Sequence, residues 1–331
     1  MAADATARGR DDCKAGTAAP AAAADAGRAL PASTRAAGAR VASTQPAAPA
    51  QFARHAACPV RGRVHVSRLM TIAGLAALTT AGCGRAGAGG LTLAGSTSLQ
   101  PFAEAWADAY RVHRPDLLIQ VQGGGSTAGV QAALSGAAQI GMCSRALTPE
   151  EGARVSGIPV ARDVMAIVVH PSNPVSELKL DQVRAIYAGQ SRNWRAFEGP
   201  DGPITVITRE EGSGTRAALE SMVMNGTRIV ASALVQDSTG AVRQMVASDP
   251  RAIGYVSLGL VDATVKALRL GGVAPSEAAV AAGRYPLVRP FLFVTRPEAR
   301  SVAAAEFIAW ITGPEGRALT RREGLLPPAR M

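Results

Sequence analysis

The chain has 331 residues, of which 47% are hydrophobic, and a formal net charge of +10. Much of the positive charge lies in residues 1–82, which contain 10 Lys or Arg and 4 Asp or Glu. Residues 83–331 show no stripe of Lys and Arg interleaved with aromatic side chains, which argues against a nucleic-acid partner. This part is long enough for two small domains, each with its own core.

Residues 1–82 do not have the composition of a folded domain. Residues 1–66 are rich in Ala, Arg, Pro and Gly and cannot bury enough apolar surface to offset the entropy of ordering. We expect this leader to be disordered or not translated, with the true start between residues 64 and 70. Residues 67–82 combine Arg68, a short apolar run and small residues, which is the pattern of a secretory signal peptide. The apolar run is too short to span a bilayer as a stable helix.

The signal ends in "TAGC", which resembles the lipobox of bacterial lipoproteins and would make Cys83 the lipidated N-terminus. We therefore expect an exported protein, periplasmic or at the cell surface, that is anchored to a membrane through Cys83. Thr80 stands where that motif usually has leucine, and an unmodified linker cysteine is the alternative interpretation. In the processed chain only Cys143 would remain free, so we expect neither an intramolecular disulfide nor a cysteine metal site.

Strand-like and helix-like patterns alternate through the rest of the chain. Apolar runs predict strands at residues 91–95, 116–122, 164–170 and 203–209. Helical periodicity predicts helices at residues 100–110, 127–137, 180–189 and 215–223. This alternation is typical of α/β units on mostly parallel sheets.

Three of the strand-to-helix junctions have the same chemistry: "LAGSTSLQPF", "VQGGGSTAGV" and "TREEGSGTRAAL". In each, glycines allow a tight turn and Ser or Thr stands at the expected start of the helix. The first amides of a helix have no partner within it, and with the helix dipole they attract an anion. One such junction is common and needs no ligand, but three in one chain, one of them beside Arg209, predict an oxyanion site. Micromolar binding requires about 8 kcal/mol, which several charge-assisted hydrogen bonds together can supply.

The junctions occur in order with "IGMCSR", "HPSNPV", "AIGYVSLG" and "YPLVRPFLFVT", and the whole series resembles the phosphate-binding proteins of bacterial ABC importers. The resemblance covers residues 91–328 and implies a two-lobe α/β periplasmic-binding-protein fold with the ligand cleft between the lobes. It implies a monomer that binds inorganic phosphate and delivers it to ABC permease subunits, without catalytic residues, cofactor or metal. Together with the strand order, it places one lobe at residues 83–168 and 258–331 and the other at 169–257.

The resemblance also assigns phosphate-binding residues, position by position, in four regions: Thr97 and Ser98 in the first junction, Ser126 in the second, Ser144 and Arg145 in "MCSR", and Arg209, Ser213, Gly214 and Thr215 in the third. Arg209 would neutralise the charge of the anion, and Glu211 could orient Arg209. Ser144 stands where some members have an aspartate that accepts the proton of hydrogen phosphate, and Gln139 replaces another aspartate. Selection of phosphate over sulfate is therefore not determined by these residues.

Three other functions fit parts of the sequence. A binding protein for sulfate, molybdate or tungstate would share the fold and is the strongest alternative. A dinucleotide-dependent oxidoreductase would use "GGGSTA", but Arg145 stands where its acidic residue is expected. A serine hydrolase would use Ser126 or Ser213, neither of which lies in a G-x-S-x-G motif. We therefore expect a binding protein rather than an enzyme.

Overall fold

The computed structural model describes residues 90–298 and 301–328. All described residues belong to one compact unit within Leu78–Met331. The expected leader, the signal peptide and Cys83 lie outside the described residues. Among the helices that the structure describes, none combines the length and apolar character needed to cross a membrane.

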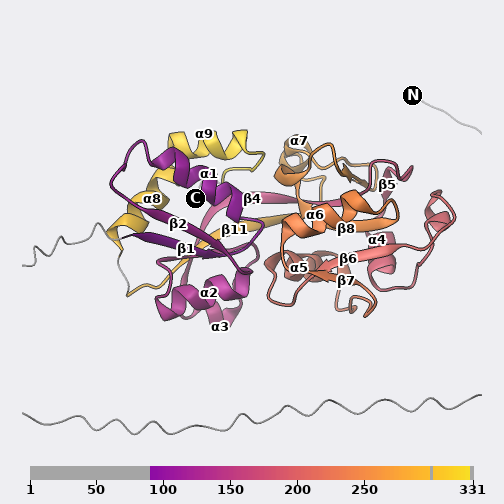
Figure 1. Cartoon of the computed structure of the whole chain (residues 1–331), viewed down its shortest axis with the longest axis horizontal. Helices are drawn as coiled ribbons and strands as arrows, with labels where there is room; N and C mark the ends of the chain where they lie inside the picture. The colour runs from indigo at the N-terminus through magenta and orange to yellow at the C-terminus, as the bar shows by residue number, and fades with distance from the viewer. Residues whose placement is uncertain (1–89, 299–300, 329–331) are drawn as a thin grey trace, which may run out of the picture. The chain divides into compact units, whose positions relative to one another are not determined.

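This unit is an α/β structure built around one mixed sheet (Figure 1). The strands of this sheet are β1 (Leu91–Gly95), β2 (Ile119–Gly123), β3 (Ile140–Cys143), β4 (Ser156–Val169), β6 (Thr205–Arg209), β7 (Leu234–Gln236), β8 (Ala252–Ser257), β9 (Lys266–Ala267) and β11 (Val288–Thr295). They follow the order β2-β1-β3-β11-β4-β8-β6-β7, and β9 also pairs with β4. Two short strands, β5 (Glu177–Leu178) and β10 (Arg269–Leu270), form a separate sheet.

The helices connect these strands as the sequence pattern predicts. They are α1 (Gln100–Tyr110), α2 (Ser126–Ser135), α3 (Pro149–Gly152), α4 (Leu180–Tyr187), α5 (Gly214–Leu219), α6 (Thr239–Ser248), α7 (Glu277–Ala281), α8 (Val302–Thr312) and α9 (Pro314–Arg322). A π-helical turn, Glu220–Met224, continues α5. The predicted strands and helices are confirmed: those at 91–95 and 100–110 have the predicted bounds, and the others have shifted ends. The predicted strand at 164–170 is the second half of the longer β4.

Parallel pairing occurs towards both ends of the sheet and antiparallel pairing in its middle. β1 pairs in parallel with β2 and β3, and β6 pairs in parallel with β7 and β8. Every antiparallel pair among the described strands involves β4 or β11. The predicted α/β class is confirmed, and the sheet is mixed because these two strands continue from one half into the other.

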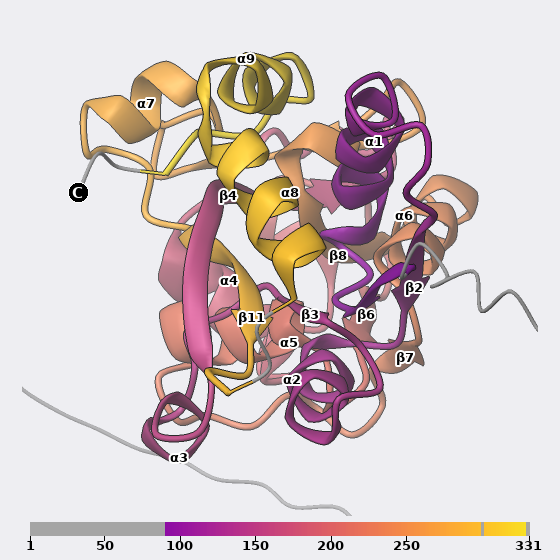
Figure 2. The same ribbon diagram turned by 90° about the vertical axis from the view of Figure 1, so that its left-hand side faces the viewer.

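Two large hydrophobic cores lie along the sheet and define two lobes. The first core joins α1, β1 and α8 with Phe291 and Phe293 of β11. In this lobe α1 and α8 cover one face of the strands and α2 covers the other (Figure 2). The second core joins α4, β6 and β8 with Tyr285 and Leu287.

The chain passes between the lobes within β4 and β11. In β4, Ala161 belongs to the first core and Val164 to the second. We therefore place the first lobe at residues 90–161 and 291–325 and the second at 164–288. This differs from the expected return to the first lobe at residue 258, because Val265, Leu268 and the residues up to Leu287 pack in the second lobe. The chain returns only where β11 pairs with β3.

Candidate functional site

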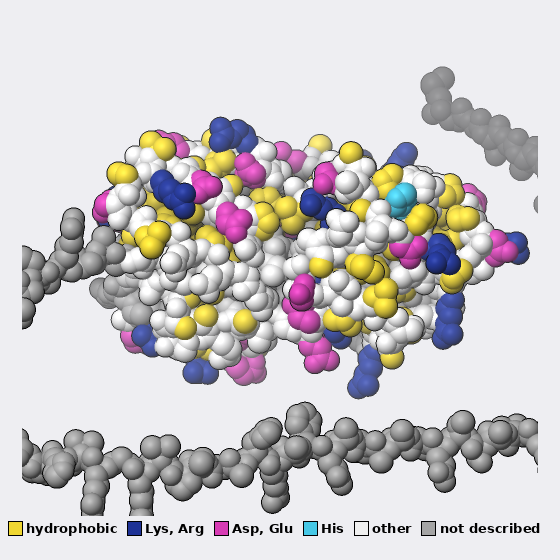
Figure 3. All heavy atoms as spheres, in the orientation of Figure 1, with side chains coloured by type: hydrophobic (Ala, Val, Ile, Leu, Met, Phe, Trp, Pro, Cys, Tyr) yellow, Lys and Arg dark blue, Asp and Glu magenta, His cyan; other side chains and the backbone are white. Residues whose placement is uncertain are grey.

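Two arginine side chains are buried in the interior, although charged side chains usually lie at the surface. On the face drawn in Figure 3, basic and acidic side chains are interspersed. Arg209 and Arg289, by contrast, are only 1% and 2% exposed. A guanidinium is almost never fully buried unless it is paired, so these two residues mark a specialised polar region.

The first lobe brings three serines to one edge of its sheet. Ser98 follows β1, Ser126 begins α2 after β2, and Ser144 follows β3; all three side chains are buried. They meet because β2, β1 and β3 are parallel neighbours, whose carboxyl ends share one edge. The Ser126 Oγ accepts a hydrogen bond from the Ser144 backbone N–H at 3.0 Å and lies 3.2 Å from the Ser144 Oγ. The predicted serines of the first two junctions and of "MCSR" thus lie together at one edge of the sheet.

The second lobe faces these serines with the start of α5. Ser213 is the N-cap of this helix, and its Oγ accepts a hydrogen bond from the Arg216 backbone N–H at 3.3 Å. The Thr215 hydroxyl donates to the Ser98 Oγ, 3.3 Å away across the lobe boundary. Gly214 approaches even more closely, because a Cβ at this position would lie 2.2 Å from the Ser126 Oγ. The predicted serine, glycine and threonine of the third junction therefore contact the first-lobe cluster or lie directly beside it.

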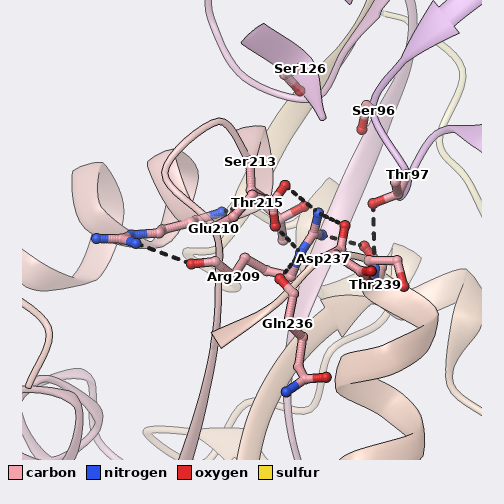
Figure 4. A network of polar contacts seen from close by, with 12 residues as sticks. Ser96, Thr97, Ser126, Arg209, Glu210, Ser213, Thr215, Gln236, Asp237 and Thr239 are labelled. Atoms are coloured by element: carbon pink, nitrogen blue, oxygen red, sulfur yellow. Dashed lines mark hydrogen bonds and ion pairs between the residues drawn. The ribbon is translucent and has the colours of Figure 1, made fainter. Parts of the chain in front are cut away.

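Arg209 ends β6 and is held on all sides (Figure 4). Its Nε and Nη2 each donate to the Glu210 carboxylate at 2.9 Å, and its Nη1 donates to the Thr239 Oγ1 at 3.0 Å. Nη2 also donates to the Asp237 carbonyl oxygen at 3.2 Å. The partner carboxylate is therefore Glu210 and not Glu211, whose side chain lies exposed in the turn before α5.

The backbone of Arg209 is fixed by Tyr255 on the neighbouring strand β8. The Tyr255 hydroxyl accepts a hydrogen bond from the Arg209 N–H at 3.1 Å and lies 2.9 Å from the Thr208 Oγ1. Burial raises the pKa of Tyr255 to about 12, so its hydroxyl stays neutral. Burial also raises the pKa of the Cys143 thiol next to Ser144, which keeps that thiol protonated and unreactive.

Thr239 is a site residue that sequence reasoning missed. It begins α6, is 1% exposed, and its backbone N–H donates to the Oγ1 of the half-buried Thr97 at 3.4 Å. The stretch "VQDSTGAV" is a fourth strand-to-helix junction with Ser and Thr at the start of its helix. The rule that selected the other three junctions would have found it.

Arg289 and Asp163 are also residues of the site that the sequence analysis did not identify. The Arg289 Nε donates to the Asp163 Oδ2 at 2.8 Å, and its Nη2 donates to the Ser98 Oγ at 3.2 Å. Burial raises the pKa of the Asp163 carboxyl, and the adjacent Arg289 and Ser257 oppose that rise. The available sequence signal was the presence of charged residues in two mainly apolar strands, Arg162 and Asp163 in "ARDVMAIVV" and Arg289 in "YPLVRPFLFV".

Arg145 is the predicted residue that the structure directs elsewhere. Its Nη1 and Nη2 donate to the Glu151 carboxylate at 2.7 and 2.8 Å. These bonds lower the pKa of Glu151 and raise that of Arg145. The guanidinium is therefore held mainly by Glu151 of α3, and its Nη2 also donates to the Thr127 Oγ1 at 3.5 Å.

The assembled site is rich in hydrogen-bond donors and closed between the lobes. The hydroxyls of Ser98, Ser126, Ser144 and Thr215 can all donate, and the two guanidinium groups can only donate. Among the described residues, no group of three or more His, Cys, Asp or Glu could hold a metal ion. Converging donors in a buried, tightly packed region favour an oxyanion as the ligand, because charge-assisted hydrogen bonds are strongest where water is excluded.

Comparisons with known proteins agree with this arrangement. The sequence matches the family model of the PBP superfamily domain over residues 77–315. The phosphate-binding protein PstS of Bacillus subtilis (strain 168) is 33% identical over 248 residues, which cover 73% of this chain and 82% of that protein.

Two solved structures are similar to the chain over the same region. One, from Clostridium perfringens, is described as a phosphate ABC transporter substrate-binding protein with bound phosphate; it is 35% identical, with a TM-score of 0.70. The other, an ABC-type phosphate transport receptor from Vibrio cholerae, is also 35% identical, with a TM-score of 0.61. Each alignment covers 72% of this chain and all of the other, and the predicted fold is confirmed. The chain therefore belongs to the PBP superfamily and, within it, to the family of PstS phosphate-binding proteins.

Proposed function

We propose that this protein binds inorganic phosphate outside the cytoplasmic membrane and delivers it to an ABC permease by closing its lobes around the anion. The observation that carries the proposal is the buried cluster of hydroxyl groups from both lobes beside Arg209. The relatives described above support phosphate as the anion, since one of them was solved with phosphate bound.

The individual roles follow from the donor geometry. Thr97, Ser98 and Ser126 donate from the first lobe, and Ser213, Thr215 and the Gly214 amide donate from the second. Arg209 supplies positive charge with a planar fork that cannot be deprotonated. For Arg145 we assign an indirect role, because Glu151 already holds its guanidinium.

Ser144 occupies the place of the aspartate found in some family members. A serine hydroxyl can accept a hydrogen bond as well as donate one. Ser144 can therefore accept the proton of hydrogen phosphate, although as a neutral acceptor it is weaker than a carboxylate. Because the same hydroxyl can also donate to an unprotonated oxyanion, Ser144 alone does not exclude sulfate.

Lobe closure follows from where the contacts lie. Thr215 bonds to Ser98 and the Thr239 amide to Thr97, each across the lobe boundary, and the Thr127 amide donates to the Gly212 carbonyl oxygen at 3.1 Å. An anion held by one lobe alone would lack the donors of the other. Phosphate therefore favours the closed arrangement because it binds that state more tightly.

A binding protein fits the site better than a hydrolase does. The Ser126 Oγ accepts from the Ser144 amide, and the Ser213 Oγ accepts from the Arg216 amide. Both serines thus accept from backbone amides, and among the described residues neither hydroxyl is hydrogen-bonded to a general base that would activate a nucleophile.

Thermal unfolding with added anion tests the proposal. A ligand that binds only the folded state stabilises it by about 2.7 kcal/mol at a concentration 100 times its Kd. The Tm of the purified protein should therefore rise in submillimolar phosphate, where general salt effects are small, and stay constant in chloride. A Tm that is the same in both anions would contradict phosphate binding.

We further propose that Cys83 carries the lipid that anchors the exported protein to a membrane, as "TAGC" suggests. The Cys83→Ser variant should then move from the membrane fraction to the soluble fraction and lose incorporation of labelled fatty acid, because the acyl chains that hold the protein at the membrane would be gone. Cys58→Ser, in the expected leader, is the matched control and should remain membrane-bound. Continued membrane attachment of Cys83→Ser would show that something other than this cysteine holds the protein.

A further inference from the structure

Arg289 and Asp163 form a buried ion pair between the two strands that join the lobes. Arg289 lies on β11 directly opposite Asp163 on β4, and the residues are 2% and 0% exposed. The Arg289 Nε and Nη2 each lie 2.8 Å from the Asp163 Oδ2, and the Ser257 hydroxyl donates to the Asp163 Oδ1. Removing two charges from water is costly, and an apolar pair of similar volume is often equally stable. Stability alone therefore does not account for this pair.

The same guanidinium reaches the anion site. Its Nη2 donates to the Ser98 Oγ at 3.2 Å, and its Nη1 donates to the Ser144 carbonyl oxygen at 3.4 Å. Two other hydroxyls surround Ser98: the Ser96 Oγ at 3.0 Å and the Thr215 Oγ1 at 3.3 Å. Ser98 thus stands between Arg289 and the hydroxyl that faces it across the lobe boundary.

The chemistry of a guanidinium fixes which way the Ser98 hydroxyl points. Arginine has donors and no acceptor, so the Ser98 Oγ must accept from Arg289. The single hydrogen of the hydroxyl is then directed away from Arg289. Without this partner the hydroxyl could rotate and turn its lone pairs towards a negatively charged ligand.

We infer that Arg289 is a positioning residue that keeps Ser98 a hydrogen-bond donor towards the bound anion, and that Asp163 holds Arg289 in the required orientation. The inference rests on the proposed phosphate function. It extends the site from the loops at the lobe edges to the two connecting strands, because both members of the pair belong to those strands. The site is therefore partly organised before the anion arrives, which reduces the entropy lost on binding.

A double variant separates this role from simple charge balance. Arg289→Met with Asp163→Asn removes both charges together, so neither is left unpaired in the interior, and methionine cannot donate to Ser98. Calorimetric titration of this variant with inorganic phosphate should show an affinity about tenfold or more below that of the wild type. In a Ser98→Ala background the same two substitutions should change the affinity by about twofold at most, because their shared target is gone.

The control for folding is Arg289→Lys, which keeps the charge paired with Asp163 but replaces the fork with a single ammonium group. Its phosphate affinity should fall several-fold when Ser98 is present. In the Ser98→Ala background the same substitution should leave the affinity unchanged, because the hydroxyl that the guanidinium orients is missing. Urea unfolding of each variant shows that the titrated protein is folded.

Three results would overturn the inference. The first is wild-type phosphate affinity in the folded double variant. The second is a loss of affinity in the Ser98→Ala background as large as the loss that the same two substitutions cause when Ser98 is present. If the double variant does not fold, wild-type affinity in Arg289→Lys overturns it instead. Failure of the wild type to bind phosphate would reject the proposed function and this inference together, whereas normal binding by wild type and variants alike would reject the inference alone.

Discussion

Replacing Arg209 with alanine should weaken phosphate binding by at least a hundredfold while the protein remains folded. Arg209 is 1% exposed and lies at the end of β6, beside the start of α5. A hydrogen bond to a charged group contributes about 1.5–3 kcal/mol, and loss of the positive charge weakens anion binding further, so an effect of this size is expected. The fold should tolerate the change, because the Glu210 side chain left behind is 33% exposed and can be hydrated.

Calorimetric titration with phosphate measures this effect. Arg195→Ala is the matched control, since Arg195 is 73% exposed and its side chain pairs with Asp201 at the surface. It should bind phosphate as the wild type does. Arg209→Lys should be intermediate, because lysine keeps the charge but not the planar fork. A folded Arg209→Ala protein with an affinity within tenfold of the wild type would remove Arg209 from the site.

Adding one methyl group at Gly214 should block lobe closure without destabilising either lobe. An alanine Cβ at this position would lie 2.2 Å from the Ser126 Oγ and 2.7 Å from the Ser144 Oγ, both on the opposite lobe. Gly214 is the first residue of α5 and has no left-handed φ, so the helix itself accepts alanine here. We therefore expect Gly214→Ala to unfold at the wild-type Tm or above it, yet to bind phosphate at least a hundredfold more weakly.

Small-angle scattering in saturating phosphate should show directly whether the lobes close. The wild type should become more compact when phosphate is added, and Gly214→Ala should not. Gly152→Ala in α3 is the control, because a Cβ there meets no atom within 4 Å. Tight binding and normal compaction of Gly214→Ala would mean that the lobes do not approach each other at this helix when the ligand is bound.

The parts of the site that could be predicted are local in the sequence. The junctions after β1, β2 and β6 each combine turn glycines with hydroxyl residues within a few positions, and the strand-to-helix alternation places them at sheet edges. The serines and the threonine that follow these strands accordingly meet in the structure. Because a parallel α/β sheet brings the carboxyl ends of its strands together, local pattern and global position agree here.

The parts that could not be predicted depend on pairing between distant strands. Arg289 and Asp163 are 126 residues apart and meet only because β11 returns antiparallel beside β4. The same return explains why the second lobe extends to residue 288, beyond the expected boundary at 257. Sequence periodicity shows that β11 is buried, but not which strand lies next to it.

The orientation of a single side chain was equally beyond local reasoning. Arg145 follows the expected motif, yet the capping box formed by Thr148 and Glu151 at the start of α3 places a carboxylate where it captures the guanidinium. Arg209 could pair with either of two adjacent carboxylates. The turn before α5 leaves Glu211 exposed and places the Glu210 carboxylate within hydrogen-bond distance of Arg209.

The similarity to phosphate-binding proteins, more than the donor-rich site itself, leads us to expect that phosphate is bound in preference to other oxyanions. Calorimetric titration of the purified protein, freed of co-purified anion, with phosphate, sulfate and molybdate in turn tests this most directly. We expect phosphate to bind with a Kd of about 1 μM or lower, which corresponds to about 8 kcal/mol, and neither of the other anions to displace it at equal concentration. Preferential binding of sulfate or molybdate would keep the fold and contradict the substrate, and no binding of any oxyanion would contradict the function.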